Sequence, residues 1–246
     1  MSKVLGVIPA RYASTRFPGK VVAKIGSKPM IQWVYEAASR CPEVDKLVIG
    51  TDDERVREAA AAFGAEVLMT AETHKSGTDR VKEVAEYYKD YDIIVNIQGD
   101  EPGIETELIS GVVKQKEEHP EWEVTTAARP FEENEDPLIP NRVKVVLSKK
   151  KKALYFSRSL IPFPRNKISE PVYLHLGIYA YQRDFLMRFN TLPGSHLEES
   201  ESLEQLRVLE NDFTMGVHIV KGSLPGVDTK EDLQKITGIF KAKGLI

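Results

Sequence analysis

Short apolar runs alternate with amphipathic segments through the first 120 residues or so, and this alternation limits the fold more than any other feature. The predicted strands are Val4–Ile8, Lys46–Gly50, Glu66–Met69 and Asp92–Ile97. The helices expected between and after them include Lys28–Arg40, Glu54–Phe63 and Thr78–Lys89. Such a strand–helix repeat predicts an α/β fold with a mostly parallel sheet and helices on both faces.

The second half of the chain has a different pattern, with more strands and shorter helices. Strands are expected at Glu123–Ala127, Val143–Leu147, Ala153–Phe156, Val172–Tyr181 and Gly216–Val220. Helices are expected at Asp184–Phe189, Leu203–Leu209 and Lys230–Ala242. No repeat, low-complexity tract or Gly/Ser/Pro-rich linker interrupts the chain. We therefore interpret residues 1–246 as one domain with a smaller mixed-sheet subregion at about residues 123–210.

Composition excludes several classes of protein. The net charge of the 246 residues is −3, so no basic excess indicates nucleic-acid binding. The single cysteine, Cys41, excludes a disulfide framework and a cysteine-rich metal site. No run approaches the roughly 20 apolar residues of a membrane span, and the first apolar run is too short for a signal sequence. These features predict a cytoplasmic protein without a membrane partner.

The loop Pro9–Lys20 directly follows the first predicted strand and is rich in cations and hydroxyls. It contains Arg11, Arg16 and Lys20, and its Pro-Gly pair forces a turn. Open α/β sheets bind ligands where their strands end, and phosphates need positive charge in a concave loop. The pattern is neither a dinucleotide-binding glycine motif nor a Walker loop. It predicts a site for a nucleoside triphosphate, although a surface loop with scattered charges is the alternative.

Two further segments have polar residues at expected helix starts or strand ends. Lys75–Arg80 combines small residues with a helix start, which suits either an ordinary N-cap or contact with a nucleotide. Asn96–Pro102 follows the strongest predicted strand and includes Gln98 and Asp100. A carboxylate at a strand end is a usual Mg²⁺ ligand, because Mg²⁺ takes one or two protein carboxylates beside phosphates.

The segment Gly226–Leu233 again precedes a predicted helix. Asp228 or Thr229 suits an N-cap there, with Asp232 completing a capping box. The spacing alone does not establish that Asp228 meets Asp100.

A last group of polar residues lies in the second half: Arg158, Arg165, His175, Tyr179, Glu204, Gln205 and Arg207. Arginine binds carboxylates, and the other side chains bind hydroxyls, so the mixture suits a polyhydroxylated acid. Each residue also has an ordinary structural explanation. His175 suits a satisfied core histidine, and Glu204 with Arg207 suits a surface pair on a helix.

Taken in order, these segments resemble the 3-deoxy-manno-octulosonate cytidylyltransferases, also called CMP-Kdo synthetases. The matching segments are Ile8–Lys20, Gly26–Ile31, Ser76–Arg80, Val95–Pro102, Val143–Arg158, His175–Tyr179, Leu203–Leu209 and Gly226–Leu233. The most specific runs are Ala-Arg-Tyr-Ala-Ser-Thr-Arg, Gln-Gly-Asp-Glu-Pro and Leu-Tyr-Phe-Ser-Arg. The resemblance implies a Rossmann-like nucleotidyltransferase fold and a homodimer formed by the second half.

The resemblance also implies a reaction and a set of site residues. The anomeric hydroxyl of Kdo would attack the α-phosphate of CTP, giving CMP-Kdo for lipopolysaccharide synthesis and pyrophosphate. Arg16, Lys20 and Asp100 would be catalytic, and Asp100 with Asp228 would bind Mg²⁺. The nucleotide-binding residues would be Ala10, Arg11, Arg16, Lys20, Ser76, Gly77 and Arg80. The sugar-binding residues would be Gln98, Arg165, His175, Tyr179, Glu204 and Gln205.

Three alternatives remain at this point. The first is the same chemistry on 8-amino-Kdo or a related sugar acid. The second is a nucleotide-sensing protein without turnover, which would be expected to lack Asp100, Asp228, Arg16 or Lys20, yet all four are present. The third is a glycosyltransferase, which would be expected to carry an Asp-x-Asp motif where this chain has Gly-Asp-Glu-Pro.

Overall fold

The computed structural model describes residues 2–166 and 170–246, and the chain divides into two compact units. The first unit takes the chain up to Ser110 together with Ser223–Ile246, and the second takes Gly111–Gly222. The predicted mixed-sheet subregion, about residues 123–210, lies inside the second unit.

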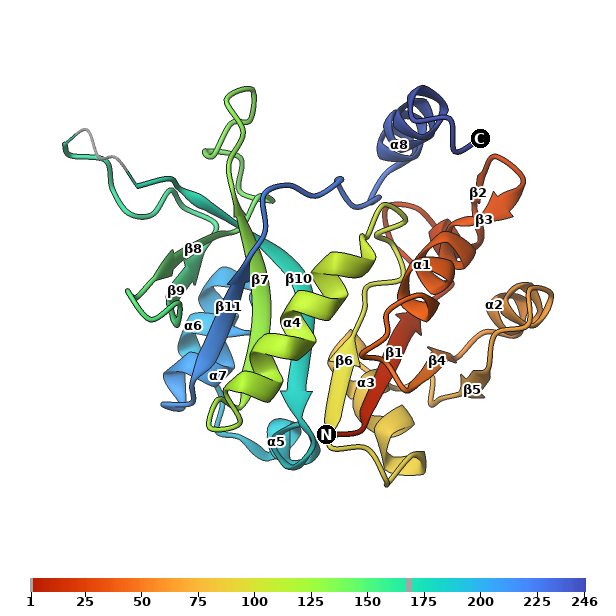
Figure 1. Ribbon diagram of the computed structural model, residues 1–246, viewed down its shortest axis with the longest axis horizontal. Coiled ribbons are helices and arrows are strands. Elements are labelled where there is room, and N and C mark those ends of the chain that lie inside the picture. The colour runs from red at the N-terminus through yellow and green to blue at the C-terminus, as the bar shows by residue number, and fades with distance from the viewer. Residues whose placement is uncertain (1, 167–169) are drawn as a thin grey trace. The chain divides into compact units, whose positions relative to one another are not determined.

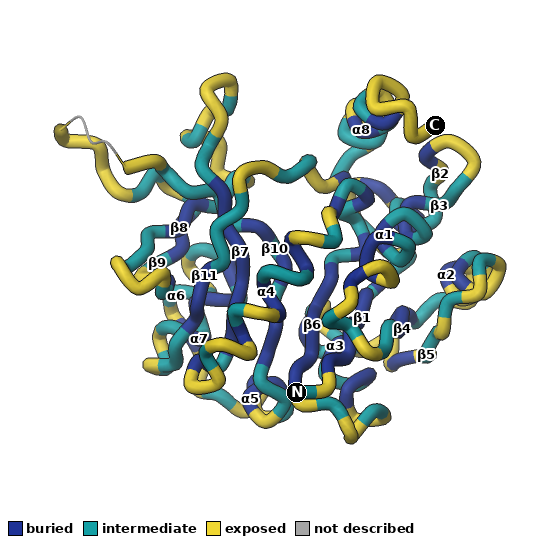
Figure 2. Tube along the Cα trace, in the orientation of Figure 1, coloured by how far each residue is buried: buried dark blue, intermediate teal, exposed yellow. Residues whose placement is uncertain are grey.

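The sheet of the first unit is wholly parallel, with the strand order β6-β1-β4-β5 (Figure 1). Its strands are β1 (Val4–Ala10), β4 (Lys46–Thr51), β5 (Val67–Met69) and β6 (Ile93–Asn96). Val7 in β1 lies opposite Val48 on one side and Asn96 on the other, so the central strand has neighbours along both edges. Figure 2 shows β1 and β6 as buried strands, as expected for a parallel sheet covered by helices.

The first unit's helices pack against this sheet or close the unit at its end. They are α1 (Met30–Ser39), α2 (Glu54–Ala61), α3 (Gly77–Tyr87) and α8 (Lys230–Ala242), with the short helix η1 (Lys20–Val22) and the hairpin β2 (Lys24–Ile25) and β3 (Lys28–Pro29). Side-chain caps start three of them. Asp53 caps α2, and capping boxes of Ser76 with Asp79 and of Thr229 with Asp232 start α3 and α8.

The C-terminal segment packs against the opening loop. Val227 and Phe240 join a buried cluster that also contains Phe17 and Met30. The backbone N–H of Val227 donates to the carbonyl of Asp100 at 2.9 Å. This packing brings the segment before α8 beside the end of β6, a contact between residues more than 120 positions apart that the sequence did not establish.

The second unit contains a mixed sheet with the order β11-β7-β10-β8-β9. Its strands are β7 (Val124–Pro130), β8 (Lys144–Leu147), β9 (Ala153–Ser157), β10 (Tyr173–Gln182) and β11 (Met215–Ile219). Only β11 and β7 run parallel, and the other pairs are antiparallel. The helices are α5 (Arg183–Arg188), η2 (Phe189–Thr191), α6 (His196–Glu201) and α7 (Leu206–Glu210). Helix α4 (Thr106–Glu118) spans the boundary between the two units.

The predicted alternation and the mixed second half are both confirmed, and the differences are local. Helix α6 was not predicted because it buries none of its residues and so has no apolar stripe; the Ser195 side chain caps its first turn. The helix predicted at Leu203–Leu209 begins only at Leu206. Among the described residues, no helix combines the length and apolar character that crossing a membrane requires.

Candidate functional site

A cavity of about 300 Å³ opens in the first unit at the carboxyl ends of β1 and β6. Its walls come from the loop after β1, the start of α3, the segment after β6 and the segment before α8. The lining residues are Pro9, Arg11, Ala13, Ser14, Thr15, Arg16, Lys20, Val21, Lys75, Ser76, Gly77, Gln98, Gly99, Asp100 and Asp228. Three predicted segments and the opening loop therefore meet at one edge of the sheet, as ligand sites in open α/β folds do.

Lys20 lies where the two predicted metal ligands meet. Its Nζ donates to Asp100 Oδ2 and, at 3.0 Å, to Asp228 Oδ1. Burial by itself would lower the pKa of Lys20, but the charges and hydrogen bonds of Asp100 and Asp228 raise it above the usual value. Lys20 is therefore a fixed positive charge in the wall of the cavity.

Arg16 adds a second positive charge to the same wall. Its Nη2 lies 2.9 Å from Asp228 Oδ2, and its side chain is more than half exposed. An exposed ion pair of this kind contributes little to stability, so Arg16 can exchange its partner for a bound anion at small cost.

The two carboxylates could hold a divalent cation. Asp100 and Asp228 both direct an oxygen at the Lys20 ammonium, so both carboxylates already converge on one positive charge. In the described ranges, no group of three or more His, Cys, Asp and Glu side chains gathers as a metal site. Two carboxylates nevertheless fit Mg²⁺, which takes its remaining oxygen ligands from phosphates and water.

The start of α3 forms the opposite part of the lining. Arg11 reaches across to it, and its Nη2 donates to the carbonyl of Ser76 at 3.0 Å and to that of His74. The Arg11 Nε is buried without a hydrogen-bond partner in the part of the chain that the structure describes. A Cβ on Gly77 would meet only Pro9 Cγ, at 3.7 Å, so the backbone at the helix start is open on the cavity side.

Ala10 and Arg80 were predicted to bind the nucleotide, but they are not in the cavity wall. Ala10 ends β1 and is fully buried. The Arg80 side chain is also fully buried, where it pairs with Asp52 and donates to Thr70. The pair of Arg80 with Asp52 links α3 to the end of β4.

Glu101, which directly follows Asp100, has an unusual pKa for a carboxyl group. Burial, together with the charge of Asp100, raises the pKa of Glu101 to about 8. Glu101 therefore stays largely protonated at neutral pH.

Five of the six predicted sugar-binding residues lie in the second unit, and only Gln98 lies in the first. His175 and Tyr179 lie on β10, with their ring centroids 5.6 Å apart. The His175 Nε2 lies 2.9 Å from Thr126 Oγ1, and burial lowers the pKa of His175 to about 3. The imidazole is therefore neutral at physiological pH and can form hydrogen bonds with a hydroxyl group.

The other predicted sugar residues are spread over different segments. Gln205, which is buried, and Glu204 lie between α6 and α7. Arg165 is exposed in the connection between β9 and β10. Gln98, by contrast, lines the cavity of the first unit.

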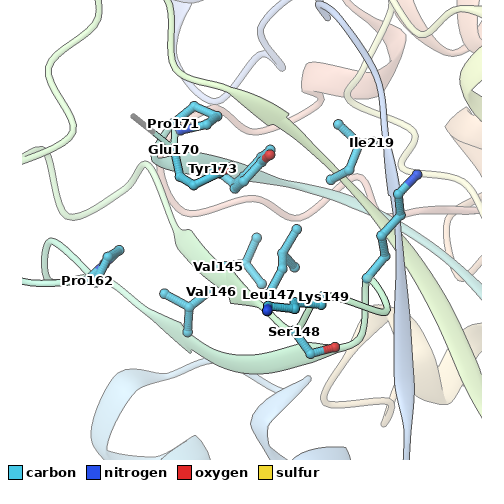
Figure 3. Close-up of a pocket in the computed structure, with 11 residues that line it drawn as sticks. Val145, Val146, Leu147, Ser148, Lys149, Pro162, Glu170, Pro171, Tyr173 and Ile219 are labelled. Atoms are coloured by element: carbon cyan, nitrogen blue, oxygen red, sulfur yellow. The ribbon is translucent and has the colours of Figure 1, made fainter. Parts of the chain in front are cut away.

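The second unit has a cavity of its own, of about 590 Å³, beside β8 (Figure 3). It is lined by Val145, Val146, Leu147, Ser148, Lys149, Lys151, Pro162, Glu170, Pro171, Tyr173 and Ile219. None of the predicted sugar-binding residues contributes to this lining.

Several lining residues of the first cavity were missed by the residue-level predictions. Ser14 and Thr15 place hydroxyls in it, and Lys75 adds a further cation. All three lie in segments that the sequence analysis had identified as candidate ligand loops. The sequence therefore indicated the right loops but not these individual residues.

Comparison with known proteins gives consistent relatives over the full length. The family model described as cytidylyltransferase matches residues 5–219. The 3-deoxy-manno-octulosonate cytidylyltransferase of Leptospira interrogans is 54% identical over 243 residues, covering 99% of this chain and 98% of that protein. The enzyme of the same name from Solibacter usitatus is 48% identical, covering 98% and 95%.

Solved structures agree with these sequence relatives. The structure of CMP:2-keto-3-deoxy-manno-octonic acid synthetase complexed with CTP has a TM-score of 0.94 and 42% identity, covering 98% of this chain and all of that one. A putative glucose-1-phosphate thymidylyltransferase from Bacillus anthracis has a TM-score of 0.68 at 16% identity, covering 96% and 94%. The second likeness concerns the fold alone.

Proposed function

The chain belongs to the cytidylyltransferase family, and from that premise we propose that it transfers CMP from CTP to Kdo. The anomeric oxygen of Kdo forms a bond to the α-phosphorus of CTP, and the bond from that phosphorus to the β-phosphate bridging oxygen breaks. The hydroxyl proton is released, and pyrophosphate leaves with the electron pair of the broken bond. The chain is 43–55% identical to proteins named 3-deoxy-manno-octulosonate cytidylyltransferase, which supports Kdo as the acceptor.

One observation in the structure carries the proposal: Lys20, Asp100 and Asp228 meet in one cavity at the carboxyl ends of the strands. Phosphoryl-type transfer needs positioning and charge neutralisation more than covalent chemistry by the protein. The cations of this cavity and its two carboxylates together supply positioning and charge neutralisation. In this proposal Arg11, Arg16 and Lys20 hold the triphosphate.

Asp100 and Asp228 would hold Mg²⁺ in the same cavity. When bound, the ion would neutralise phosphate charge and favour departure of pyrophosphate. The protein's own part is to direct both carboxylates at one point, which their contacts with Lys20 and Arg16 do before any ligand arrives.

Ser76 and Gly77 would face the nucleoside, since both line the cavity and a Cβ on Gly77 would meet only Pro9 Cγ. For the sugar acid we propose Gln98, Arg165, His175, Tyr179, Glu204 and Gln205. Arg165 suits the carboxylate, because its guanidinium is exposed and always charged. Neutral His175 suits a sugar hydroxyl, because it exchanges hydrogen bonds without adding charge.

We also propose a cytoplasmic homodimer whose product enters lipopolysaccharide synthesis. Large apolar side chains of the second unit, Leu138, Leu154 and Phe163, are at least 60% exposed, which supports association through that unit. Sedimentation of the purified chain tests the dimer, and a monomer at micromolar concentration would contradict it.

The function is tested by incubating the purified chain with CTP, Mg²⁺ and Kdo. Pyrophosphate release that depends on Kdo, with CMP-Kdo identified by mass spectrometry, is the expected result. Parallel reactions with 8-amino-Kdo and N-acetylneuraminate test the acceptor, and reactions with UTP test the base. Product from 8-amino-Kdo but none from Kdo would overturn the assignment of the acceptor.

A further inference from the structure

We propose that Tyr12 and Arg55 are positioning residues that hold the opening loop in its triphosphate-binding shape. Together with Gly19 and Asp53 they form a contact that we call the loop clasp. The inference rests on the proposed role of Arg16 and Lys20, which is to bind the triphosphate. The proposed function gives no role to the residues of the loop clasp.

The clasp begins with a backbone bond that joins the two ends of the loop. The N–H of Gly19 donates to the carbonyl of Tyr12 at 2.7 Å, which closes the intervening chain into a ring. Gly19 has φ of 72°, in the left-handed region that favours glycine. Lys20 follows directly, so this bond helps to set where Lys20 leaves the loop.

The Tyr12 ring then covers the closed end. A Cβ built on Gly19 would lie 3.0–3.1 Å from three atoms of the Tyr12 side chain, closer than carbon atoms normally approach. The ring therefore packs directly on the Gly19 backbone. Two independent features, the positive φ and the ring, therefore favour glycine at this position.

Arg55 stacks on the same ring from outside the loop. Its guanidinium carbon lies 3.4 Å from the centre of the Tyr12 ring, well within cation–π range. Arg55 comes from the first turn of α2, so the contact ties the loop to a helix of the sheet's flank.

Asp53 fixes the direction of that guanidinium. It accepts from Arg55 Nε at 2.9 Å and from Nη2 at 2.6 Å, a bidentate pair. The same carboxylate caps α2 by accepting the backbone N–H of Arg55 at 2.9 Å. A side chain that is 61% exposed is thus held in one orientation, over the ring, instead of moving freely in solvent.

The contrast with Arg57 shows why this arrangement is not a routine surface pair. Arg57 lies on the same helix and pairs with Glu54, and both side chains are about half exposed. Among the described residues no ring stacks with Arg57, whereas Arg55 stacks on Tyr12. The consequence for function is a loop ordered before CTP arrives, so that less of the binding free energy is used to order it.

The test compares Arg55→Gln and Tyr12→Leu with the matched control Arg57→Gln. Arg55→Gln should raise KM for CTP about two- to fivefold, the effect of one exposed cation–π contact. Tyr12→Leu should raise it about tenfold, because the ring that covers the closed end is lost. KM for Kdo, and the melting temperature, should stay near the wild-type values in both. Tyr12→Phe, which keeps the ring, should restore most of the CTP affinity.

A second measurement does not depend on turnover. Trypsin can cut after Arg16, and cleavage there, followed by mass spectrometry, reports how often the loop opens. Both clasp variants should be cut faster than wild type and Arg57→Gln at the wild-type rate. The double variant Tyr12→Leu/Arg55→Gln should be no worse than Tyr12→Leu alone, because the two side chains act through one contact.

Gly19→Ala with Gly64→Ala forms a second matched pair. Both glycines have positive φ, but a Cβ on Gly64 meets nothing within 4 Å, whereas on Gly19 it meets the ring. Only Gly19→Ala should raise KM for CTP and speed cleavage after Arg16.

Unchanged KM and cleavage in all clasp variants of an active enzyme would overturn the clasp and leave the proposed function standing. A wild type inactive with CTP and Kdo would overturn the function, while the cleavage rates would still decide the clasp.

Discussion

Two groups of ion pairs, one in each unit, have different surroundings. In the first, Lys20, Asp100 and Asp228 pair along the wall of a cavity, where the Asp228 side chain is 48% exposed. In the second, Arg129 and Glu135 form a bidentate pair with side chains only 6% and 15% exposed. A pair that opens on a cavity can be rearranged by a ligand, whereas a closed pair serves the fold. Ion pairs of similar geometry therefore predict different consequences when they are broken.

The units also differ in how well their predicted residues come together. Eight predicted residues of the first unit line one cavity, namely Arg11, Arg16, Lys20, Ser76, Gly77, Gln98, Asp100 and Asp228. In the second unit the predicted residues lie on β10, in a β9–β10 connection and between two short helices. Parallel strands end at a common edge, so residues that follow them converge, but a mixed sheet imposes no such rule.

The largest effect is expected from Asp100→Asn. The change removes a charged oxygen at the point where Lys20 and Asp228 meet, and with it a proposed Mg²⁺ ligand. We expect kcat to fall about two to three orders of magnitude, the scale of losing one preorganised electrostatic group. Steady-state kinetics over a Mg²⁺ titration measures this. Asp90→Asn, the same change at an exposed residue of the first unit, is the control. A kcat near wild type would contradict the metal role of Asp100.

An intermediate effect is expected from Arg165→Ala in the second unit. The proposed partner of this guanidinium is the sugar carboxylate, and a charge-assisted hydrogen bond is lost. KM for Kdo should rise roughly ten- to a hundredfold, while calorimetry should find the affinity for CTP unchanged. Lys150→Ala, which removes another exposed cation of this unit, should change neither. Weakened CTP binding in Arg165→Ala would contradict the assignment of Arg165 to the sugar acid alone.

The smallest effect, and one on stability alone, is expected from Glu135→Gln. Hydrogen bonds from Arg129 lower the pKa of Glu135 from 4.5 to about 2. The native state therefore favours the charged carboxylate, so the stabilisation is present above about pH 4.5 and is lost as the pH falls toward 2. Reduced for partial solvent exposure, it amounts to about 1–2 kcal/mol in the free energy of unfolding at neutral pH.

Urea unfolding of wild type and Glu135→Gln between pH 3 and 7 checks this expectation. The two should differ most at neutral pH and converge in acid, with kcat unchanged at neutral pH. Glu117→Gln, at an exposed position of α4, provides the control for loss of one negative charge. A difference that does not shrink between pH 7 and pH 3 would show that packing, not the ionised pair, is responsible.

Much of the fold was predictable because it depends on local patterns. The strand β1 and the helix α8 were located from apolar spacing. Residue type limited the caps to Ser76 or Thr78 and to Asp228 or Thr229, and the structure has Ser76 and Thr229. Helix α6 escaped prediction because it has no buried face. Arg80 shows the limit for single positions: the run Ser76–Arg80 was recognised, but the Arg80 side chain is buried, pairs with Asp52 and is not among the residues that line the cavity.

The sequence by itself determined the α/β class, the resemblance to the cytidylyltransferases and the loops that carry polar residues at strand ends. These properties follow from the periodicity of side chains and from runs of adjacent residues, which need no knowledge of distant contacts. Only the tertiary structure decided that Asp228 meets Asp100, because that meeting depends on Val227 and Phe240 packing on the opening loop. The same holds for Tyr12 and Arg55, which come from separate elements and stack only because the sheet places α2 beside the loop.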